Sequence, residues 1–226
     1  MSRGLQVLAS YTWSHNLDIS SDSNDGGYPV NAYDWHPDYG NSNWDIRHRF
    51  VASVVYELPK LKTSPWLVRG FLGDWQLNNI TTLQSGKPIN VTMAADIASI
   101  SRAGNQRPDI VGPLHANCNT GHINNCIDIS AFAQPAAFTL GNGGRNKLVG
   151  PAYLNTDFSL FKNFPIHESL KLQFRAEFFN AFNRPQLGNP DGTITNFDPA
   201  NPGSFGNITN TIADNRDIQF GVKLVF

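Results

Sequence analysis

Six segments of this chain alternate apolar and polar residues, and this period of two constrains the fold more than any other feature. The clearest segment is LKLQFRAEFFN, residues 170–180, in which Leu172 and Phe174 alternate with charged and amide side chains. A period of two places successive side chains on opposite faces of a β-strand. A helix would instead spread Arg175 and Glu177 around an apolar cylinder, so we predict a strand. The other five segments are residues 4–15, 46–58, 73–86, 154–164 and 216–226.

The connections between these segments alternate in length along the chain. Residues 16–45, 87–153 and 184–215 form long connections, whereas residues 59–71 and 165–169 form short ones. Compact soluble domains rarely contain several such loops. Outer-membrane barrels do contain them, because their extracellular loops are long and their periplasmic turns are short. We therefore predict an all-β fold, an antiparallel transmembrane β-barrel segment of about six strands in a bacterial outer membrane.

The composition and the first residues of the chain argue against several classes of protein. A net charge of −1 provides no field that would favour the phosphates of a nucleic acid, so we expect no nucleic-acid partner. No apolar run reaches the roughly 18 residues of a membrane-spanning helix. The first ten residues, MSRGLQVLAS, lack the apolar core of a signal peptide. These facts leave two interpretations, a cytoplasmic protein or an internal piece of a longer exported chain. The barrel pattern favours the second interpretation.

The two faces of the predicted strands differ in chemistry. The polar faces would point into a hydrated lumen, and there we place Asp157, Arg175 and Glu177. Asp157 and Arg175 lie at similar distances from residues 165–169, so we predict that they are cross-strand neighbours within a two-residue register slip. The apolar faces suit lipid, with aromatic girdles at the two interfaces formed by Tyr11, Trp13, Tyr56, Trp75, Phe178 and Phe226.

The same alternation also fits a secreted, soluble β-sandwich whose apolar faces form a core. Such a module would bind carbohydrate through its loop aromatics. Long loops at one end only, and the aromatic content of the apolar faces, favour the barrel. A secreted hydrolase is a further alternative, but no paired carboxylates stand in a defined motif and no G-x-S-x-G is present. We therefore expect no enzymatic activity, no catalytic residue, no cofactor and no metal.

The loop of residues 16–45 combines acids with aromatics. We expect a solvated acidic loop, with a calcium site as the alternative, although the spacing misses that of a calcium loop; the acids are Asp22, Asp25, Asp34, Asp38 and Asp45. Aromatic side chains in such a loop can capture a sugar or a peptide. We predict Trp35 and Tyr39 as ligand-contacting residues within the set Tyr28, Tyr33, Trp35, Tyr39 and Trp44.

Two cysteines stand close together in CNTGHINNC, at Cys118 and Cys126. Their polar, turn-rich surroundings favour a local disulfide formed in an oxidising compartment. Two unpaired thiols are one alternative. A zinc site with His115 and His122 is another, although the spacing matches no standard ligand pattern.

Several long stretches of the chain resemble a known family. The stretch GNGGRNKLVGPAYLNTDFSLFKNFPIHESLKLQFRAEFFNAFNRPQLGNP, residues 141–190, is similar to the C-terminal barrel region of TonB-dependent outer-membrane receptors. Within that family it looks most like the Oar-like group, whose full members carry an N-terminal carboxypeptidase-regulatory-like domain. The stretches YTWSHNLD, DIRHRFVASVVYELP, WQLNNITTLQSGKPINVT and AFAQPAAFTLGNGGRN fit the same family in the same order.

The resemblance implies a barrel of about 22 strands filled by an N-terminal plug domain. It also implies uptake driven by an inner-membrane energy-transducing complex that pulls on the N-terminus of the receptor. Residues 1–226 would be the C-terminal part of such a barrel, without the plug and without the earlier strands. The partners would be outer-membrane lipid, the plug and the remaining strands, the energy-transducing complex and a ligand such as an oligosaccharide or peptide.

The final residues, QFGVKLVF, resemble the C-terminal signal by which the barrel-assembly machinery recognises its clients. That resemblance assigns the signal to Gln219, Gly221, Leu224 and Phe226. The machinery pairs with a strand edge, so the signal must be a strand. In the mature barrel Phe226 would lie at the periplasmic interface, where an aromatic ring is favoured.

Overall fold

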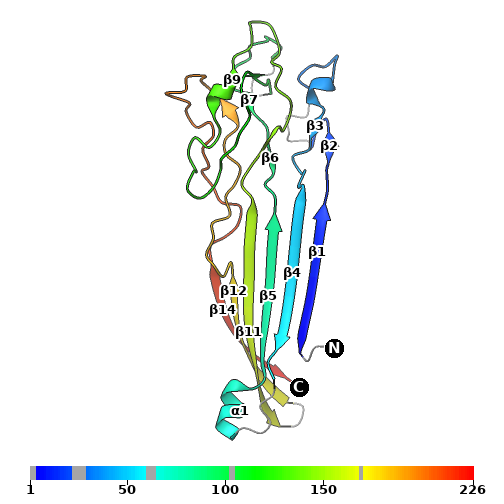
Figure 1. Cartoon of the computed structure of the whole chain (residues 1–226), viewed down its shortest axis with the longest axis vertical. Coiled ribbons are helices and arrows are strands. Elements are labelled where there is room, and N and C mark those ends of the chain that lie inside the picture. The colour runs from blue at the N-terminus through cyan, green and yellow to red at the C-terminus, as the bar shows by residue number, and fades with distance from the viewer. Residues whose placement is uncertain (1–3, 22–28, 60–64, 102–104, 168–169) are drawn as a thin grey trace.

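Six strands form one antiparallel sheet in the computed structural model, which describes residues 4–21, 29–59, 65–101, 105–167 and 170–226 (Figure 1). Each of the six predicted segments corresponds to one of these strands, and β11 extends beyond its segment at both ends. The segment at residues 170–180, which could have been read as a helix, is a strand. The strands are β1 (Leu5–Trp13), β4 (His48–Glu57), β5 (Trp75–Gln84), β11 (Tyr153–His167), β12 (Leu170–Phe179) and β14 (Asp217–Val225).

The sheet is a meander in which each strand pairs with its neighbour in the chain, in the order β1-β4-β5-β11-β12-β14. In the part of the chain that the structure describes, β1 and β14 are edge strands, and the other sheets have only two strands each. No second large sheet covers the apolar face of the first among these residues, so the architecture does not support the β-sandwich alternative. No helix in the same ranges is long and apolar enough to cross a membrane.

The strand register separates the sheet into an apolar face and a polar face. One row of paired residues runs Val7, Val54, Asn79, Phe158, Phe178 and Ile218, and the next row, on the opposite face, runs Gln6, Val55, Asn78, Ser159, Glu177 and Gln219. The predicted girdle residues on the strands all have the parity of the apolar face. Val55 is apolar but lies on the polar face, because register, not hydrophobicity, decides the side.

Lys162 is the only lysine, arginine, aspartate or glutamate on the apolar face of the six described strands, and its charge is covered rather than exposed. The side chain is 1% exposed and its ammonium group donates to the backbone oxygen of Gly73. The Nζ atom lies 5.6 Å from the centre of the Trp75 ring and 5.3 Å from that of Phe164. The aromatic rings and the carbonyl replace water around the cation, so the apolar face keeps an uncharged surface.

The two short connections lie at one end of the sheet, and they differ in detail from the prediction (Figure 1). The first contains a helix, α1 (Trp66–Leu72), whose end is tied to β5 by a 2.8 Å hydrogen bond from Trp75 Nε1 to Phe71 O. The second is shorter than predicted, because β11 continues through Pro165 to His167, with a register shift between these two residues.

The predicted pairing of Asp157 with Arg175 is wrong. Arg175 lies opposite Phe161, four residues from Asp157 and beyond a two-residue slip. The cause is the extension of β11, which centres the turn later in the chain and places each β11 residue opposite a later residue of β12.

The three long loops lie together at the other end of the sheet (Figure 1). We call this assembly the cap, comprising the described parts of residues 14–47, 85–152 and 180–216. The cap contains only short elements: β2 (Leu17–Asp18), η1 (His36–Asp38), β3 (Gly40–Asn41), β6 (Pro88–Ile89), β7 (Thr92–Met93), β8 (Asp109–Ile110), η2 (Ile129–Ala131), β9 (Phe132–Ala133), β10 (Leu148–Val149) and β13 (Thr193–Ile194).

Candidate ligand-binding site

The cap is built around a hydrophobic core of its own, although its sequence reads as polar loops. The parallel pair β7–β13 joins residues 85–152 to residues 180–216, and Ile208 N donates to Ile123 O at 2.7 Å. Phe132 and Phe205 meet edge to face with ring centres 5.9 Å apart. Around them pack Ile89, Val91, Cys126, Ile127, Ile129, Ala131, Leu148, Ile194 and Ile208. Burial of these side chains makes the two loops one unit.

A disulfide between Cys118 and Cys126 closes the small loop at the edge of this core. Cys126 is 5% exposed and its backbone nitrogen donates to Gly206 O at 3.0 Å. The bond therefore fixes a strand-like bridge, Ala116 to Ile127, against the loop that carries Gly206.

Residues 29–47 of the first loop dock on this unit through a buried arginine. Arg107 Nη1 donates to Asp38 Oδ1 at 2.9 Å, and both side chains are under a tenth exposed. Arg107 Nη2 also donates to Pro37 O at 2.6 Å and its Nε to Gly143 O at 2.9 Å. Because all three donor groups have acceptors, the cost of burying the charge is offset by hydrogen bonds and by the carboxylate.

A second buried arginine holds the beginning of the same loop. Arg145 binds Asp18 through Nη1 and donates to Ser21 Oγ at 2.7 Å through Nη2. Burial acts to raise the pKa of Asp18, but hydrogen bonds from Ser42, Arg145 and Ser21 outweigh it and hold the pKa below its ordinary value. The carboxylate thus stays ionised and paired at neutral pH.

Asparagines complete the contact between the first and second long loops. Asn146 Nδ2 donates to Asn41 O at 2.6 Å and to Asn43 Oδ1 at 2.7 Å, and Asn41 Nδ2 donates back to Asn146 O at 3.0 Å. Asn146 is 1% exposed. This reciprocal pair fixes β3 of the first loop beside the segment that carries Arg145.

The docked first loop presents a shallow, mainly aromatic hollow of about 720 Å³ at the end of the cap. Trp35 is 53% exposed and Tyr39 is 59% exposed, so neither ring is used in the core. The hollow is lined by Ile19, Tyr33, Asp34, Trp35, His36 and Tyr39. The structure therefore brings together the two aromatics that the sequence predicted as ligand contacts.

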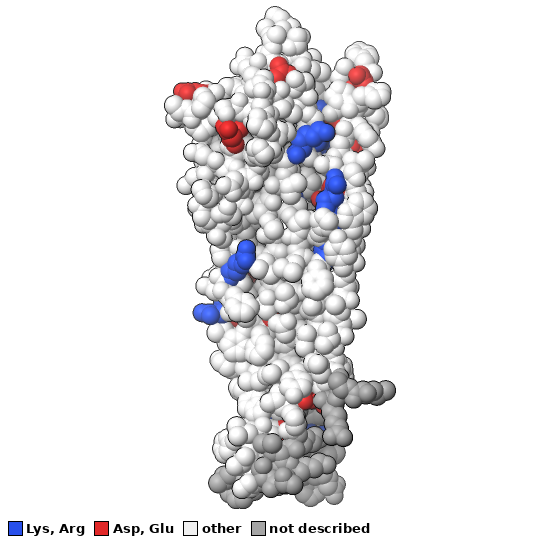
Figure 2. All heavy atoms as spheres, viewed as in Figure 1, with Lys and Arg blue, Asp and Glu red and all other residues white. Residues whose placement is uncertain are grey.

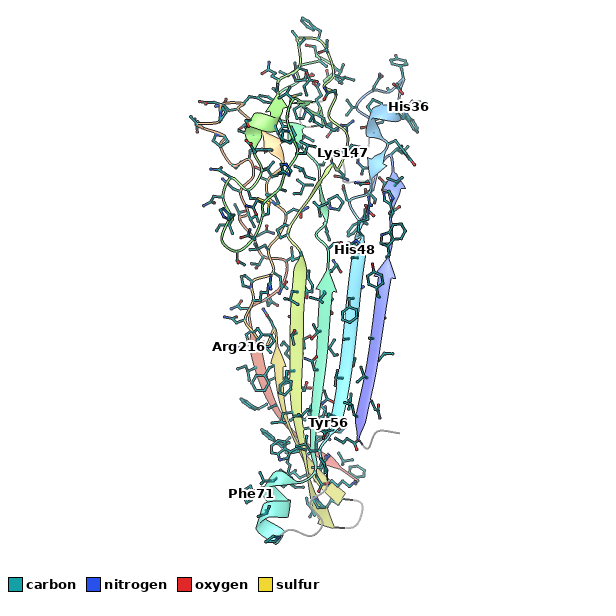
Figure 3. All side chains as sticks on the ribbon, viewed as in Figure 1. His36, His48, Tyr56, Phe71, Lys147 and Arg216 are labelled. Carbon is teal, nitrogen blue, oxygen red and sulfur yellow. A yellow bond between two sulfur atoms is a disulfide. The ribbon has the colours of Figure 1, made fainter. Side chains whose placement is uncertain are left out.

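A polar pair lies among these rings. Asp34 Oδ1 accepts hydrogen bonds from the backbone nitrogen of His36 at 3.0 Å and from its ring Nδ1 at 2.7 Å. These bonds, the backbone one first, lower the pKa of Asp34. His36 lies at the far end of the cap (Figure 3). Aromatic faces beside an ionised carboxylate can stack on apolar rings and accept hydrogen bonds from hydroxyl or amine groups.

Other members of the predicted loop set have different environments. Trp44 lies outside the hollow, with Lys87 Nζ 4.9 Å from its ring centre. Asp38 and Asp45 are 5% and 3% exposed and are paired with Arg107 and Arg47, so the expectation of a solvated acidic loop is wrong at these positions. Asp22, Asp25 and Tyr28 lie outside the described residues. No group of three or more potential metal ligands lies close together among the residues that are described.

The three predicted lumen-facing residues share the polar face but do not form one cluster. Asp157 Oδ1 accepts from Asn155 Nδ2 and from the backbone of Asn180, both at 2.9 Å. Arg175 donates to Gln173 Oε1 at 2.7 Å, and its guanidinium lies 4.7 Å from the centre of the Phe161 ring. Glu177 is paired in register with Ser159 and Gln219.

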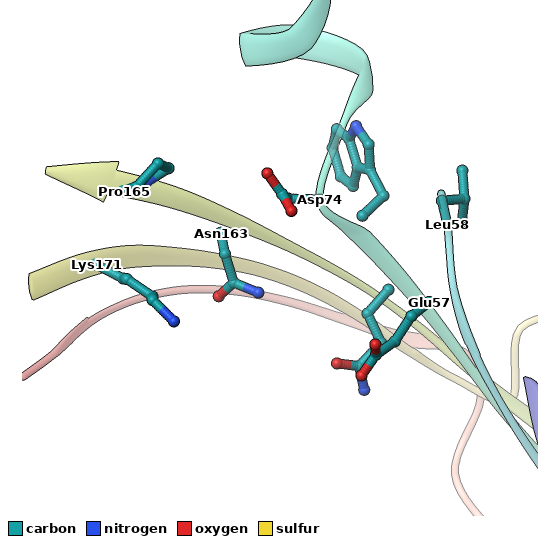
Figure 4. A pocket seen from close by; sticks show the side chains of 8 residues that line it. Glu57, Leu58, Asp74, Asn163, Pro165 and Lys171 are labelled. Atoms are coloured by element: carbon teal, nitrogen blue, oxygen red, sulfur yellow. The ribbon is translucent and has the colours of Figure 1, made fainter. Parts of the chain in front are cut away.

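A second hollow lies on the polar face near the short connections, with a volume of about 310 Å³ (Figure 4). Glu57 of β4 and Asp74, which precedes β5, contribute carboxylates, and Lys171 of β12 contributes a cation. Gln76 and Asn163 add amides. The hollow is therefore polar, mixed in charge and at the opposite end of the sheet from the cap.

The four residues assigned to the C-terminal signal divide between the two faces of β14. Gln219 pairs with Glu177 and Gly221 with Arg175 on the polar face, whereas Leu224 pairs with Leu172 on the apolar face. Phe226 follows the end of the strand and is 93% exposed.

Sequence reasoning missed Arg107 and Arg145, the residues that organise the site. Arg145 stands in GNGGRN, which the sequence analysis used only for the family resemblance. The available signal was an arginine among glycines in one loop, together with several aspartates in another loop. This pattern fits a buried ion pair but does not identify the aspartate that binds the arginine.

Comparison with known proteins gives one match. A family model described as an outer membrane beta barrel domain matches residues 1–219. No curated protein and no solved structure matches the chain.

Proposed function

The chain belongs to the outer membrane β-barrel domain family, and on that premise we propose that it forms wall and cap in a receptor for energy-coupled ligand uptake. Membership of the family places the chain in the bacterial outer membrane. We infer that its apolar face meets lipid and that its long loops lie outside, as is usual in outer-membrane barrels. The finer assignment, a TonB-dependent receptor of the Oar-like group, rests on the resemblance of residues 141–190.

The observation that carries the proposal is the ordered cap. Loops with no function beyond connecting strands do not need a hydrophobic core, a disulfide and two buried arginines. Here Arg107 and Arg145 hold the first loop in one position, so the rings of Trp35 and Tyr39 are presented on a rigid support. A preorganised hollow binds with a smaller entropic cost than a mobile loop.

The chemistry of the hollow suits an oligosaccharide or a peptide. Trp35 and Tyr39 offer flat apolar faces, and Asp34 offers an acceptor that remains ionised. Sugars and peptides both combine apolar faces with hydrogen-bond donors, which is what this lining complements. We assign no covalent chemistry to the site.

Uptake would need a path and an energy source beyond the cap. The polar face would line part of the path, and the hollow at Glu57, Asp74 and Lys171 would lie against a plug domain that couples to an inner-membrane energy-transducing complex. Further strands would pair with the outer edges of β1 and β14, the edge strands among the described residues, since open edges are not tolerated in hydrocarbon.

Capture by the hollow can be tested in cells that carry the complete receptor. We expect Trp35→Ala with Tyr39→Ala to weaken ligand binding and uptake about tenfold or more, because each ring supplies stacking area. Phe138→Ala is the matched control, since this ring is 78% exposed on the cap but lies outside the hollow. If the double variant and the control show equal uptake at equal surface level, the first loop is not part of the binding site.

We also propose that β14 is read by the barrel-assembly machinery. As an edge strand among the described residues, β14 offers a free edge for pairing. Replacing Phe226 by Ala should reduce the surface level of the receptor, whereas Lys223→Ala, on the polar face of the same strand, should leave it unchanged. Normal surface levels of the Phe226 variant would contradict this role.

A further inference from the structure

Cations gather where the apolar face meets the cap. Figure 2 shows a broad uncharged band over the strands, with Lys and Arg along its border with the cap and most of the Asp and Glu farther out in the loops. Figure 3 places Arg216 beside the outer end of β14, at the lower end of this group of cations, and Lys147 at its upper end, within the cap. The separation of charge by height is the arrangement expected beside a layer of negative headgroups.

The border is oblique, and the strand register explains why. On β12 and β14 the apolar rows end at Phe178 and Ile218, which align with Phe158 of β11. On β5 and β11 they continue to Leu83 and Leu154, four residues farther, or about 13 Å. Barrel strands tilt by about 35–45° from the membrane normal. A stagger of this kind is the one expected where the apolar band of tilted strands meets the plane of the membrane surface.

Two lysines lie above the higher part of the border. Lys87 precedes β6 and Lys147 precedes β10, and these two short strands pair with each other. Both side chains are exposed. Lys87 Nζ stands over the ring of Trp44, 4.9 Å from its centre. Neither lysine has an acidic partner among the described residues, in contrast to Arg47 nearby, which is paired with Asp45.

Two arginines lie above the lower part of the border. Arg184 follows β12 and Arg216 precedes β14, and their positions are linked because the Arg216 backbone nitrogen donates to Asn183 Oδ1 at 3.0 Å. Arg184 is anchored in the same way, through its backbone nitrogen to Asn180 Oδ1 at 3.0 Å. Both guanidinium groups are exposed, and within the described ranges neither meets a carboxylate. The backbones are fixed while the charged groups stay available.

We propose that Lys87, Lys147, Arg184 and Arg216 bind the phosphate groups of a phosphorylated glycolipid in the outer leaflet of the outer membrane. We call these four residues the cationic border. The apolar band below would hold acyl chains, while the cationic border would neutralise headgroup phosphates at the depth where they lie. This role depends on the membrane location of the chain and is independent of ligand uptake.

Charge complementarity distinguishes this surface from the polar face. A cation beside an anionic lipid surface contributes about 1 kcal/mol, which corresponds to roughly a fivefold change in affinity. Arginine can bind phosphate through two parallel hydrogen bonds, whereas lysine acts as a point charge. Arg49 and Lys223 are also exposed, but they lie on the polar face, away from lipid, and serve as matched controls.

The test measures binding of bis-phosphorylated lipid A to the complete receptor purified from outer membranes in neutral detergent. Lys87→Gln with Lys147→Gln, and Arg184→Gln with Arg216→Gln, should each weaken binding about 25-fold and flatten its salt dependence. Arg49→Gln with Lys223→Gln, which removes the same charge, should leave binding unchanged. Exchange of Lys for Arg and Arg for Lys across the cationic border should retain most of the affinity.

Two further arms identify the chemistry that is recognised. Lipid A without its phosphates should bind no better to the wild type than to the glutamine variants. Inorganic phosphate alone should not saturate the protein at millimolar concentration. Saturable binding of inorganic phosphate, or equal loss of lipid A affinity in the polar-face control, would overturn the proposal. If the receptor with one pair of glutamine substitutions does not assemble, the other pair and the Lys/Arg exchange variant still test the proposal.

Discussion

Arg107 and Asp38 form a buried ion pair across 69 residues of sequence, with 2.9 Å between Nη1 and Oδ1. The pair joins the first long loop to the unit formed by the other two. It is the contact on which the position of the aromatic hollow depends, because η1 carries Asp38 and also His36 of the hollow.

Removing one partner of this pair should release the loop. Arg107→Met leaves Asp38 buried without its cation, and we expect a loss of about 3–5 kcal/mol in local stability. Hydrogen exchange of residues 29–47 would measure it. The double variant Arg107→Met with Asp38→Leu should recover much of the loss, since no charge then remains buried. If residues 29–47 exchange as fast in the double variant as in the single variant, the pair is not the docking contact.

The pH dependence of docking has a defined sign. The pKa of Asp18 is lower in the folded cap than its ordinary value of 3.8. Its contribution is therefore complete above about pH 4 and is lost as the pH falls through the lower, folded pKa. Hydrogen exchange near β2 and β3, corrected for the intrinsic rate at each pH, should rise only in this acidic range. Asp18→Asn should raise exchange at neutral pH and remove the acid-dependent step.

The membrane-facing side makes a prediction for two adjacent residues. Leu160 lies on the apolar face and Ser159 on the polar face of β11, near the middle of the strand. Leu160→Lys should destabilise the membrane-inserted barrel by about 2–4 kcal/mol, whereas Ser159→Lys should change little. Unfolding of the two variants in lipid bilayers would measure the difference. Equal destabilisation would show that the two sides of the sheet meet the same environment.

The strands were predictable from the sequence because an alternating pattern depends only on neighbours along the chain. Register was not, since it depends on where a turn is centred. For that reason Asp157 and Arg175, placed opposite each other from the sequence, are four residues out of register. The helix α1 was also missed, because residues 59–71 are too short and too mixed to display a helical period.

The candidate site was predictable in part. Trp35 and Tyr39 were identified from the aromatic content of one loop, which is a local property. Their support was not, because Arg107 and Arg145 bind partners 69 and 127 residues away, and no periodic pattern links them. Polar composition also predicted exposed acids in this loop, whereas Asp38 and Asp45 are buried by pairing with arginine.

If the sheet is a membrane wall with one face to lipid and one to water, successive residues of β4 must meet different environments. Val51, Ala52, Ser53 and Val54 are replaced one at a time by cysteine; the native cysteines are joined in a disulfide, so each new thiol is unique. A fluorophore on each thiol is then exposed, in outer membranes, to a lipid-soluble and a water-soluble quencher. The account predicts lipid quenching at residues 52 and 54 and aqueous quenching at residues 51 and 53, although Val51 is apolar. Uniform quenching along the strand, or quenching that follows side-chain hydrophobicity instead of register, would contradict it.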